Sequence, residues 1–228
     1  ITIPLGLVWL LGWLVDVSVV QQLALIAMLV VGAWAIMGHQ LTRLLVFPLL
    51  FLFFAVPMGE GLIPPMQQFT ALSAVWMIEM TGIPVYREGL IFTLPSGRWE
   101  VVQACSGVRY IIASVTIGTL YAYLTYRSWP RRLLFVIASA IVPVLANSVR
   151  AYTIVMLGHV SDMTVAVGAD HLVYGWLFFG LVIFVLFWLG SFFREDHLVQ
   201  AATHRGTKAP GSDLSGSNLK LLLVFCTT

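Results

Sequence analysis

Residues 133–157 read LLFVIASAIVPVLANSVRAYTIVML, an apolar run interrupted by a single charged side chain, Arg150. A helix that crosses the hydrocarbon core of a bilayer needs about 20 apolar residues, because each residue adds about 1.5 Å to a span of about 30 Å. This run is long enough, so it predicts a transmembrane helix. The fold of the whole chain depends on how many similar runs accompany it.

Five more apolar runs surround this one, at about 1–15, 19–37, 41–57, 105–126 and 172–193. Of the 228 residues, 60% are hydrophobic and 10% are charged, and the mean hydropathy is +0.95. About 25% of residues are charged in a soluble domain, so this chain lacks the polar surface that a water-soluble protein needs. We therefore expect an all-α polytopic transmembrane helical bundle of about six spans, with membrane lipid as its solvent.

The basic residues indicate the orientation of the bundle. The clearest basic cluster lies at 127–132, and the positive-inside rule places that loop in the cytoplasm. Arg43 and Arg194 fall on the same side if residues 66–81, an apolar but short stretch with several polar side chains, do not cross the membrane. We therefore expect 66–81 to form an interfacial or re-entrant helix on the outer face.

Two stretches do not have the character of spans. Between 86 and 103, alternating apolar residues flank the turn sequence Pro95-Ser96-Gly97-Arg98, which predicts a short extracytoplasmic β-hairpin. The chain becomes polar after residue 196, so we expect a transmembrane domain at 1–196 and a tail at 197–228 that is disordered or not native. Ile1 opens the chain without a charged segment or a cleavage site, so no signal peptide is predicted, and we expect the true start to be missing.

The predicted topology brings three chemically notable side chains to one face of the membrane. Cys105 begins one helix at the outer face, His171 begins another there, and Arg150 lies late in the helix that rises between them. Arg150 sits about seven residues, or about 10 Å, before the expected end of its helix. Its long side chain or a bend at Pro143 would have to close that gap.

Cys105 is the candidate nucleophile. We expect Ser106 to cap the following helix, with Gly107 next to it, which would leave the thiol beside the unpaired N–H groups of a helix start. That position and a nearby cation favour a thiolate, and the free N–H groups could bind an oxyanion. The alternative is that a lone membrane cysteine is only a small buried hydrophobic side chain.

Arg150 and Asn147 are the candidate polar groups inside the 133–157 helix. An arginine there costs about 2.5–3.5 kcal/mol to insert, which usually marks a functional or paired charge; a snorkelling arginine near the interface is the alternative. Asn147 lies one turn before Arg150. It either fixes the guanidinium or forms a hydrogen bond to a neighbouring helix.

Two further side chains complete the candidate set. His171 can move protons near neutral pH, unless it is an ordinary interfacial histidine. Arg109 lies four residues after Cys105, on the same helical face if both are helical. It could assist the thiolate or bind a substrate carboxylate, or it could pair with Glu100 or a lipid phosphate. His159 is assigned to a loop without a clear partner.

Several classes of function are excluded. The two cysteines, Cys105 and Cys226, lie far apart, and the chain has no CxxC pair and no Cys/His cluster at zinc spacing. We therefore expect no disulfide framework, no metal and no cofactor. A thiol redox enzyme would need a resolving cysteine that the membrane region lacks. A net charge of +2 is too small to indicate nucleic-acid binding.

Three separated motifs occur in a characteristic order: Ala-Cys-Ser-Gly-Val-Arg at 104–109, Asn-Ser-Val-Arg at 147–150, and His171 followed by Tyr-Gly-Trp. Together with their flanking sequences, over about residues 5–193, they resemble the exosortase/archaeosortase family, most closely its exosortase A type. The catalytic Cys, Arg and His of that family map onto Cys105, Arg150 and His171. We add Arg109, Asn147, Ser106 and Gly107 as supporting or substrate-binding residues.

The resemblance implies a cysteine protease or transpeptidase of the bacterial inner membrane, active at the periplasmic face and associated with exopolysaccharide production. Its expected partners are exported proteins with a C-terminal sorting signal, which consists of a Pro-Glu-Pro motif, a membrane helix and a basic end. Cleavage would pass through a thioacyl enzyme, and the hairpin at 86–103 could bind the extended substrate by strand addition. The alternative is a non-enzymatic transporter or exopolysaccharide-export component, in which Arg150 and His171 line a polar path.

Overall fold

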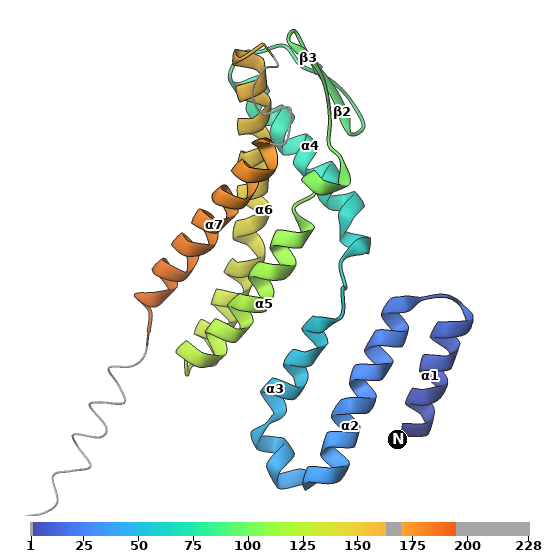
Figure 1. The fold of residues 1–228 in the computed structure, drawn as a ribbon. Helices are drawn as coiled ribbons and strands as arrows, with labels where there is room; N and C mark the ends of the chain where they lie inside the picture. The colour runs from blue at the N-terminus through green and yellow to red at the C-terminus, as the bar shows by residue number, and fades with distance from the viewer. Residues whose placement is uncertain (1, 163–169, 195–228) are drawn as a thin grey trace, which may run out of the picture.

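The computed structural model describes residues 2–162 and 170–194, with only the backbone described at 170–173. The polar tail predicted at 197–228 therefore lies outside the described residues. Helices make up most of the described part (Figure 1): α1 (Thr2–Leu14), α2 (Ser18–Leu44), α3 (Val46–Phe51), α4 (Ile63–Met80), α5 (Val108–Thr125), α6 (Trp129–Val160) and α7 (Asp170–Ser191). Short 3-10 turns lie at η1 (Leu52–Ala55), η2 (Glu60–Leu62) and η3 (Gln103–Cys105).

The helical membrane bundle predicted from the sequence is confirmed. Among the described residues, four helices are long and apolar enough to cross a bilayer: Ser18–Leu44, Gln103–Thr125, Trp129–Val160 and Tyr174–Ser191. The pair Val46–Ala55 and Glu60–Met80, bent by 64°, is a fifth if it counts as one broken span. The expected count was about six. It differs because the first apolar run forms only the 13-residue α1, about 20 Å long and too short for the hydrocarbon core.

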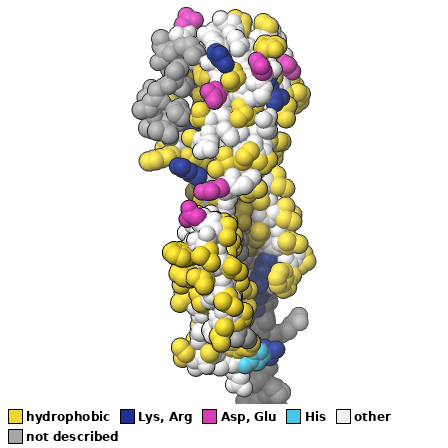
Figure 2. All heavy atoms as spheres, turned by 90° about the vertical axis from the view of Figure 1, so that its right-hand side faces the viewer, with side chains coloured by type: hydrophobic (Ala, Val, Ile, Leu, Met, Phe, Trp, Pro, Cys, Tyr) yellow, Lys and Arg dark blue, Asp and Glu magenta, His cyan; other side chains and the backbone are white. Residues whose placement is uncertain are grey.

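The basic segments lie together at one end of the bundle. Phe47 of α3 stacks on Tyr123 near the end of α5, with ring centroids 3.5 Å apart. Arg131 near the start of α6 donates a hydrogen bond to the carbonyl of Phe193, just after α7. The end of α2, the loop between α5 and α6 and the end of α7, which carry the segments predicted to be cytoplasmic, lie away from the sheet (Figure 1). Hydrophobic side chains cover much of the lower part of the face in Figure 2, whereas acidic side chains lie higher.

A small antiparallel sheet forms the other end of the molecule. Its strands are β1 (Tyr86–Glu88), β2 (Ile91–Leu94) and β3 (Gly97–Glu100), in the order β1-β2-β3. The hairpin predicted at 86–103 is present with a third strand, because the chain also turns at Gly89, whose φ is +63°. Phe92 and Leu94 of β2 point into a hydrophobic core that α4 and α6 complete.

Helix α4 has one face buried in the protein core, and whether it is the interfacial or re-entrant helix predicted at 66–81 stays a prediction. Ala71 and Ile78 are fully buried in the core beneath the sheet, and α4 packs along α6 (Figure 1). It follows α3 after the 64° bend, in the half of the molecule that carries the sheet. Its buried polar residues Gln67 and Thr70 face the chain that leads to Cys105: Gln67 donates to the carbonyl of Val101 over 2.8 Å.

Candidate active site

Cys105 is half-buried and lies at the end of η3, outside helix α5. Its N–H donates to the carbonyl of Val102 over 2.9 Å. Helix α5 begins only at Val108, so the prediction that Cys105 begins the helix is wrong by three residues. The capping position belongs to Gly107, not to Ser106, although the Ser106 hydroxyl still accepts a hydrogen bond from the N–H of Val108 over 3.5 Å.

Gly107 separates the cysteine turn from α5 and is required on two grounds. Its φ of +76° is the left-handed conformation that other residues adopt only at a cost. A Cβ atom there would lie 2.7 Å from Cγ of Asn147. The left-handed residue ends the 3-10 turn and starts a helix in a new direction. Arg109 and Cys105 therefore do not share a helical face, although the sequence predicted that they would if both were helical.

Asn147 of α6 holds the cysteine turn in place. It is 2% exposed, and its Nδ2 donates to the main-chain carbonyl of Cys105 over 2.9 Å and to Oγ1 of Thr70 over 3.0 Å. Its Oδ1 has no hydrogen-bond partner among the described atoms. Of the two alternatives for Asn147, the described contacts therefore fit a hydrogen bond to a neighbouring helix, here to Thr70 of α4.

Arg150 lies beside the cysteine turn. It is 6% exposed and lines one cavity together with Cys105. The expected 10 Å offset does not arise, because η3 and the start of α5 lie beside the middle of α6 instead of its end (Figure 1). Its guanidinium carbon also lies 6.0 Å from the ring of Tyr110 and 5.9 Å from that of Phe179, within the range of a cation–π contact.

Helix α7 packs directly against this guanidinium. A Cβ atom at Gly175 would lie 2.7 Å from Nη2 of Arg150, so a larger residue there would displace the guanidinium or α7. His171 lies one helical turn before Gly175, in the first turn of α7, and thus on the same side of the helix. Its side chain lies outside the described atoms. The structure therefore gives the position of the helix turn that carries His171. The part of the imidazole in proton transfer stays a prediction.

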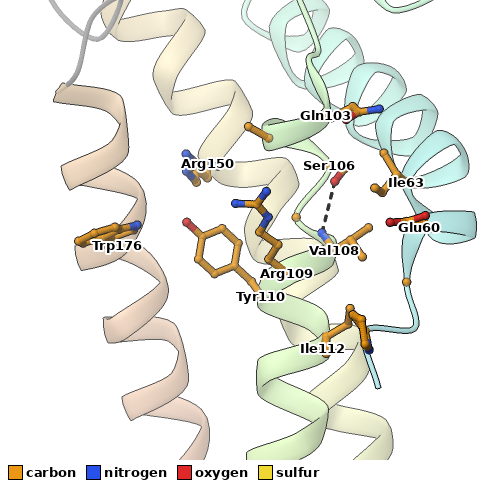
Figure 3. Close-up of a pocket in the computed structure, with 14 residues that line it drawn as sticks. Glu60, Ile63, Gln103, Ser106, Val108, Arg109, Tyr110, Ile112, Arg150 and Trp176 are labelled. Carbon is orange, nitrogen blue, oxygen red and sulfur yellow. Dashed lines mark hydrogen bonds between the residues drawn. The ribbon is translucent and has the colours of Figure 1, made fainter. Parts of the chain in front are cut away.

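Arg150 lines three cavities, one of them between α6 and α7 and the other two beside the cysteine turn. The smaller, about 60 Å³, is lined by Cys105 and Arg150 together with residues of β3, α4 and α6. The larger, about 510 Å³, lies in front of the cysteine turn (Figure 3) and is lined by Gln103, Ser106, Gly107, Arg109, Tyr110, Trp176, Glu60 and others. Arg150 thus lines both the small cavity of Cys105 and the larger pocket in front of the cysteine turn.

Arg109 belongs to the larger pocket and not to the cavity of Cys105. Its side chain is exposed and reaches toward the side of the pocket where Arg150 and Tyr110 lie (Figure 3). Over residues 2–162 and 170–194 it forms no ion pair, so the pairing with Glu100 is not present there. The position suits binding of a substrate carboxylate better than assistance to the thiol. Among the side chains that the structure describes, no three His, Cys, Asp or Glu residues could hold a metal ion.

Two residues to which the sequence analysis gave no part in the site have clear places in the structure. His159, predicted to lie in a loop, is in the last turn of α6, and its Nδ1 lies 2.7 Å from Oγ of Ser96 in the turn between β2 and β3. It ties the sheet to α6. Trp99 of β3 lines the small cavity together with Cys105 and Arg150. A tryptophan in a short strand is ordinarily a packing residue, so the sequence carried no signal for it.

The chain matches one known family over most of its length. Residues 1–188 fit the model of that family, described as transmembrane exosortase. The chain belongs to the transmembrane exosortase family. The matched range contains the cysteine turn, all of α6 and the first turns of α7, so the exosortase motifs recognised in the sequence and the site built here lie inside it. No curated protein and no solved structure matches the chain.

Proposed function

We propose that this exosortase is a cysteine protease and transpeptidase that cleaves C-terminal sorting signals of exported proteins at the periplasmic face of the inner membrane. One observation carries the proposal: Cys105 and Arg150, far apart in sequence, line one cavity. Burial disfavours the charged thiolate that a cysteine nucleophile needs, and the neighbouring arginine offsets part of that cost. The basic segments lie at the opposite end of the bundle, as a cytoplasmic end should.

The reaction proceeds in two steps. The Cys105 sulfur attacks the scissile carbonyl carbon and forms a C–S bond as its thiol proton passes to His171, while the carbonyl electrons move to the oxygen, whose charge Arg150 stabilises. The oxyanion then collapses, the C–N bond breaks, and His171 gives that proton to the departing amine. In the second step an acceptor nucleophile loses its proton to His171 and attacks the carbonyl carbon of the thioacyl enzyme, the C–S bond breaks, and the proton returns to the Cys105 sulfur.

The substrate reaches the site as an extended chain along β3. The N–H of Val101 donates to the carbonyl of Leu90, so alternate residues of this strand face β2 and the main-chain groups of Arg98 and Glu100 face away from it. No backbone hydrogen bond from the described residues covers these groups. A Pro-Glu-Pro segment paired with this edge would lead toward Cys105, five residues beyond Glu100, while its membrane helix lies beside the bundle.

The decisive experiment is co-expression with a substrate that carries a Pro-Glu-Pro signal, followed by immunoblotting for the cleaved form. Alanine at Cys105, Arg150 or His171 should each leave the substrate uncleaved although the protein inserts normally. Cys226→Ala is the matched control and should cleave like the wild type. A transporter or export component would instead keep its function in the Cys105→Ala variant, and that result would refute the protease.

A further inference from the structure

Trp99 carries a buried polar atom that the fold itself does not use. Its ring packs against the core beneath the sheet, in contact with the same cluster as Cys105. Its indole Nε1 is buried and has no hydrogen-bond partner among the described residues. A buried donor left unpaired costs about 1–3 kcal/mol, and more than 90% of buried polar groups in folded proteins are paired. Among the described residues, this indole N–H is therefore left as a donor for a bound ligand.

The surroundings of Trp99 define the chemistry of that partner. Trp99, Cys105 and Arg150 line the same cavity, whose volume is about 60 Å³. That space admits a small group, since one water molecule occupies about 30 Å³ in the liquid. An indole N–H and a guanidinium are hydrogen-bond donors only. A ligand atom that bonds to either group must therefore be an acceptor, and beside a nucleophilic sulfur the fitting acceptor is the carbonyl oxygen of a peptide bond.

The sheet gives the indole a fixed position. Trp99 pairs with Phe92 in the register of β2 and β3, and Phe92 is 2% exposed in the core. This pairing and the core beneath it hold the indole rigidly. A rigid donor costs no reorganisation when charge develops on a substrate oxygen, which is the property that an oxyanion-binding group needs.

We propose that the indole N–H of Trp99 donates a hydrogen bond to the oxygen of the scissile carbonyl and, with Arg150, stabilises the oxyanion that forms when Cys105 attacks. Trp99 is then a catalytic residue of this exosortase. The inference rests on the proposed protease function, and it adds a group that forms no covalent bond to the substrate.

The test replaces the N–H and keeps the ring. Trp99→Phe, and the isosteric benzothienyl analogue of tryptophan in which sulfur replaces the N–H, are made in a Cys226→Ala background. Cleavage of a Pro-Glu-Pro peptide by the purified protein is followed in detergent, and the alkylation rate of Cys105 by iodoacetamide is measured in parallel. Loss of one oxyanion donor lowers kcat by about 100-fold to 1000-fold. We expect that fall in kcat with KM and the alkylation rate changed less than about twofold.

The controls separate this inference from the proposed function. Trp76→Phe, at a tryptophan that is 60% exposed on α4, should cleave like the wild type. If the wild type does not cleave, the protease proposal fails. If the wild type cleaves, Cys105→Ala does not, and both Trp99 variants retain the wild-type kcat, the Trp99 inference alone is overturned. A matching loss of kcat and of alkylation would show a packing role and would also overturn it.

Discussion

The side-chain amide of Asn147 donates a hydrogen bond to the main-chain carbonyl of Cys105 over 2.9 Å. The same nitrogen lies 3.0 Å from Oγ1 of Thr70, so one buried amide joins α6, the cysteine turn and α4. Arg150 follows Asn147 by three residues, less than one turn of the same helix. The bond therefore fixes the position of Cys105 along the axis of α6, relative to Arg150.

Asn147→Ala should weaken both the fold and the reaction. It leaves the part-buried carbonyl of Cys105 without its donor, which costs about 0.5–1.5 kcal/mol, and it frees the cysteine turn to move away from Arg150. We expect a lower melting temperature by scanning fluorimetry and slower cleavage of the peptide substrate. Thr153→Ala is the control on α6, because that exposed hydroxyl bonds only to its own helix. Equal melting temperatures for the two variants would contradict the bridging role.

Gly107→Ala should destabilise the protein more than Gly89→Ala. Both glycines have a positive φ, +76° and +63°, and each substitution carries the cost of about 1–2 kcal/mol for a left-handed residue. Only at Gly107 does a new Cβ meet Asn147, at 2.7 Å; at Gly89 no described atom lies within 4 Å. The difference between the two losses of unfolding free energy measures the clash. Adding Asn147→Ala to Gly107→Ala should recover part of it, and a strictly additive double variant would argue against the contact.

Gly175→Ala should slow cleavage, whereas Gly180→Ala should not. The Cβ at 175 would lie 2.7 Å from Nη2 of Arg150 and would displace the guanidinium or α7. At Gly180 the described surroundings leave the space open within 4 Å, and alanine favours a helix over glycine by about 1 kcal/mol. The measurement is the rate of substrate cleavage at equal expression. Wild-type activity in the Gly175→Ala variant would show that the position of the guanidinium is not critical.

Tyr126 should make the basic end of the bundle sensitive to alkaline pH. Its hydroxyl donates to the carbonyl of Gly190 over 2.6 Å. Burial, and then the neighbouring Tyr121, raise the pKa of Tyr126 to about 12, against a smaller opposing effect of Arg131. Because the folded pKa lies above the ordinary value of 10.0, this contribution to stability is complete below pH 10 and is lost as the pH rises toward 12.

Tyr126→Phe removes both the bond and its titration. At pH 8 the variant should be less stable than the wild type by about 1 kcal/mol, and the difference in melting temperature should shrink between pH 10 and pH 12. Tyr86→Phe, at a tyrosine that is 71% exposed, should follow the wild type throughout. A difference between Tyr126→Phe and the wild type that does not change with pH would contradict the raised pKa.

The class of fold and the family could both be predicted from the residues alone. Long apolar runs require lipid whatever their partners, so the helices of the bundle follow from composition and length. The end of α2, the loop between α5 and α6 and the end of α7, which carry the basic segments, lie away from the sheet (Figure 1), and the orientation in the membrane stays a prediction. The three motifs pointed to the exosortase family, which the match over residues 1–188 confirms.

The assembly of the site, in contrast, emerges only from the folded chain. The sequence predicted that Cys105 begins a helix and that Arg150 lies about 10 Å farther from the outer face. This was wrong because apolar periodicity does not reveal where a helix starts. The left-handed Gly107 and the amide of Asn147 instead put the cysteine turn beside the middle of α6. The cavity shared by Trp99, Cys105 and Arg150 could not be predicted either, because it lies between β3, η3 and α6. Such long-range contacts depend on packing in three dimensions, which local residue patterns do not encode.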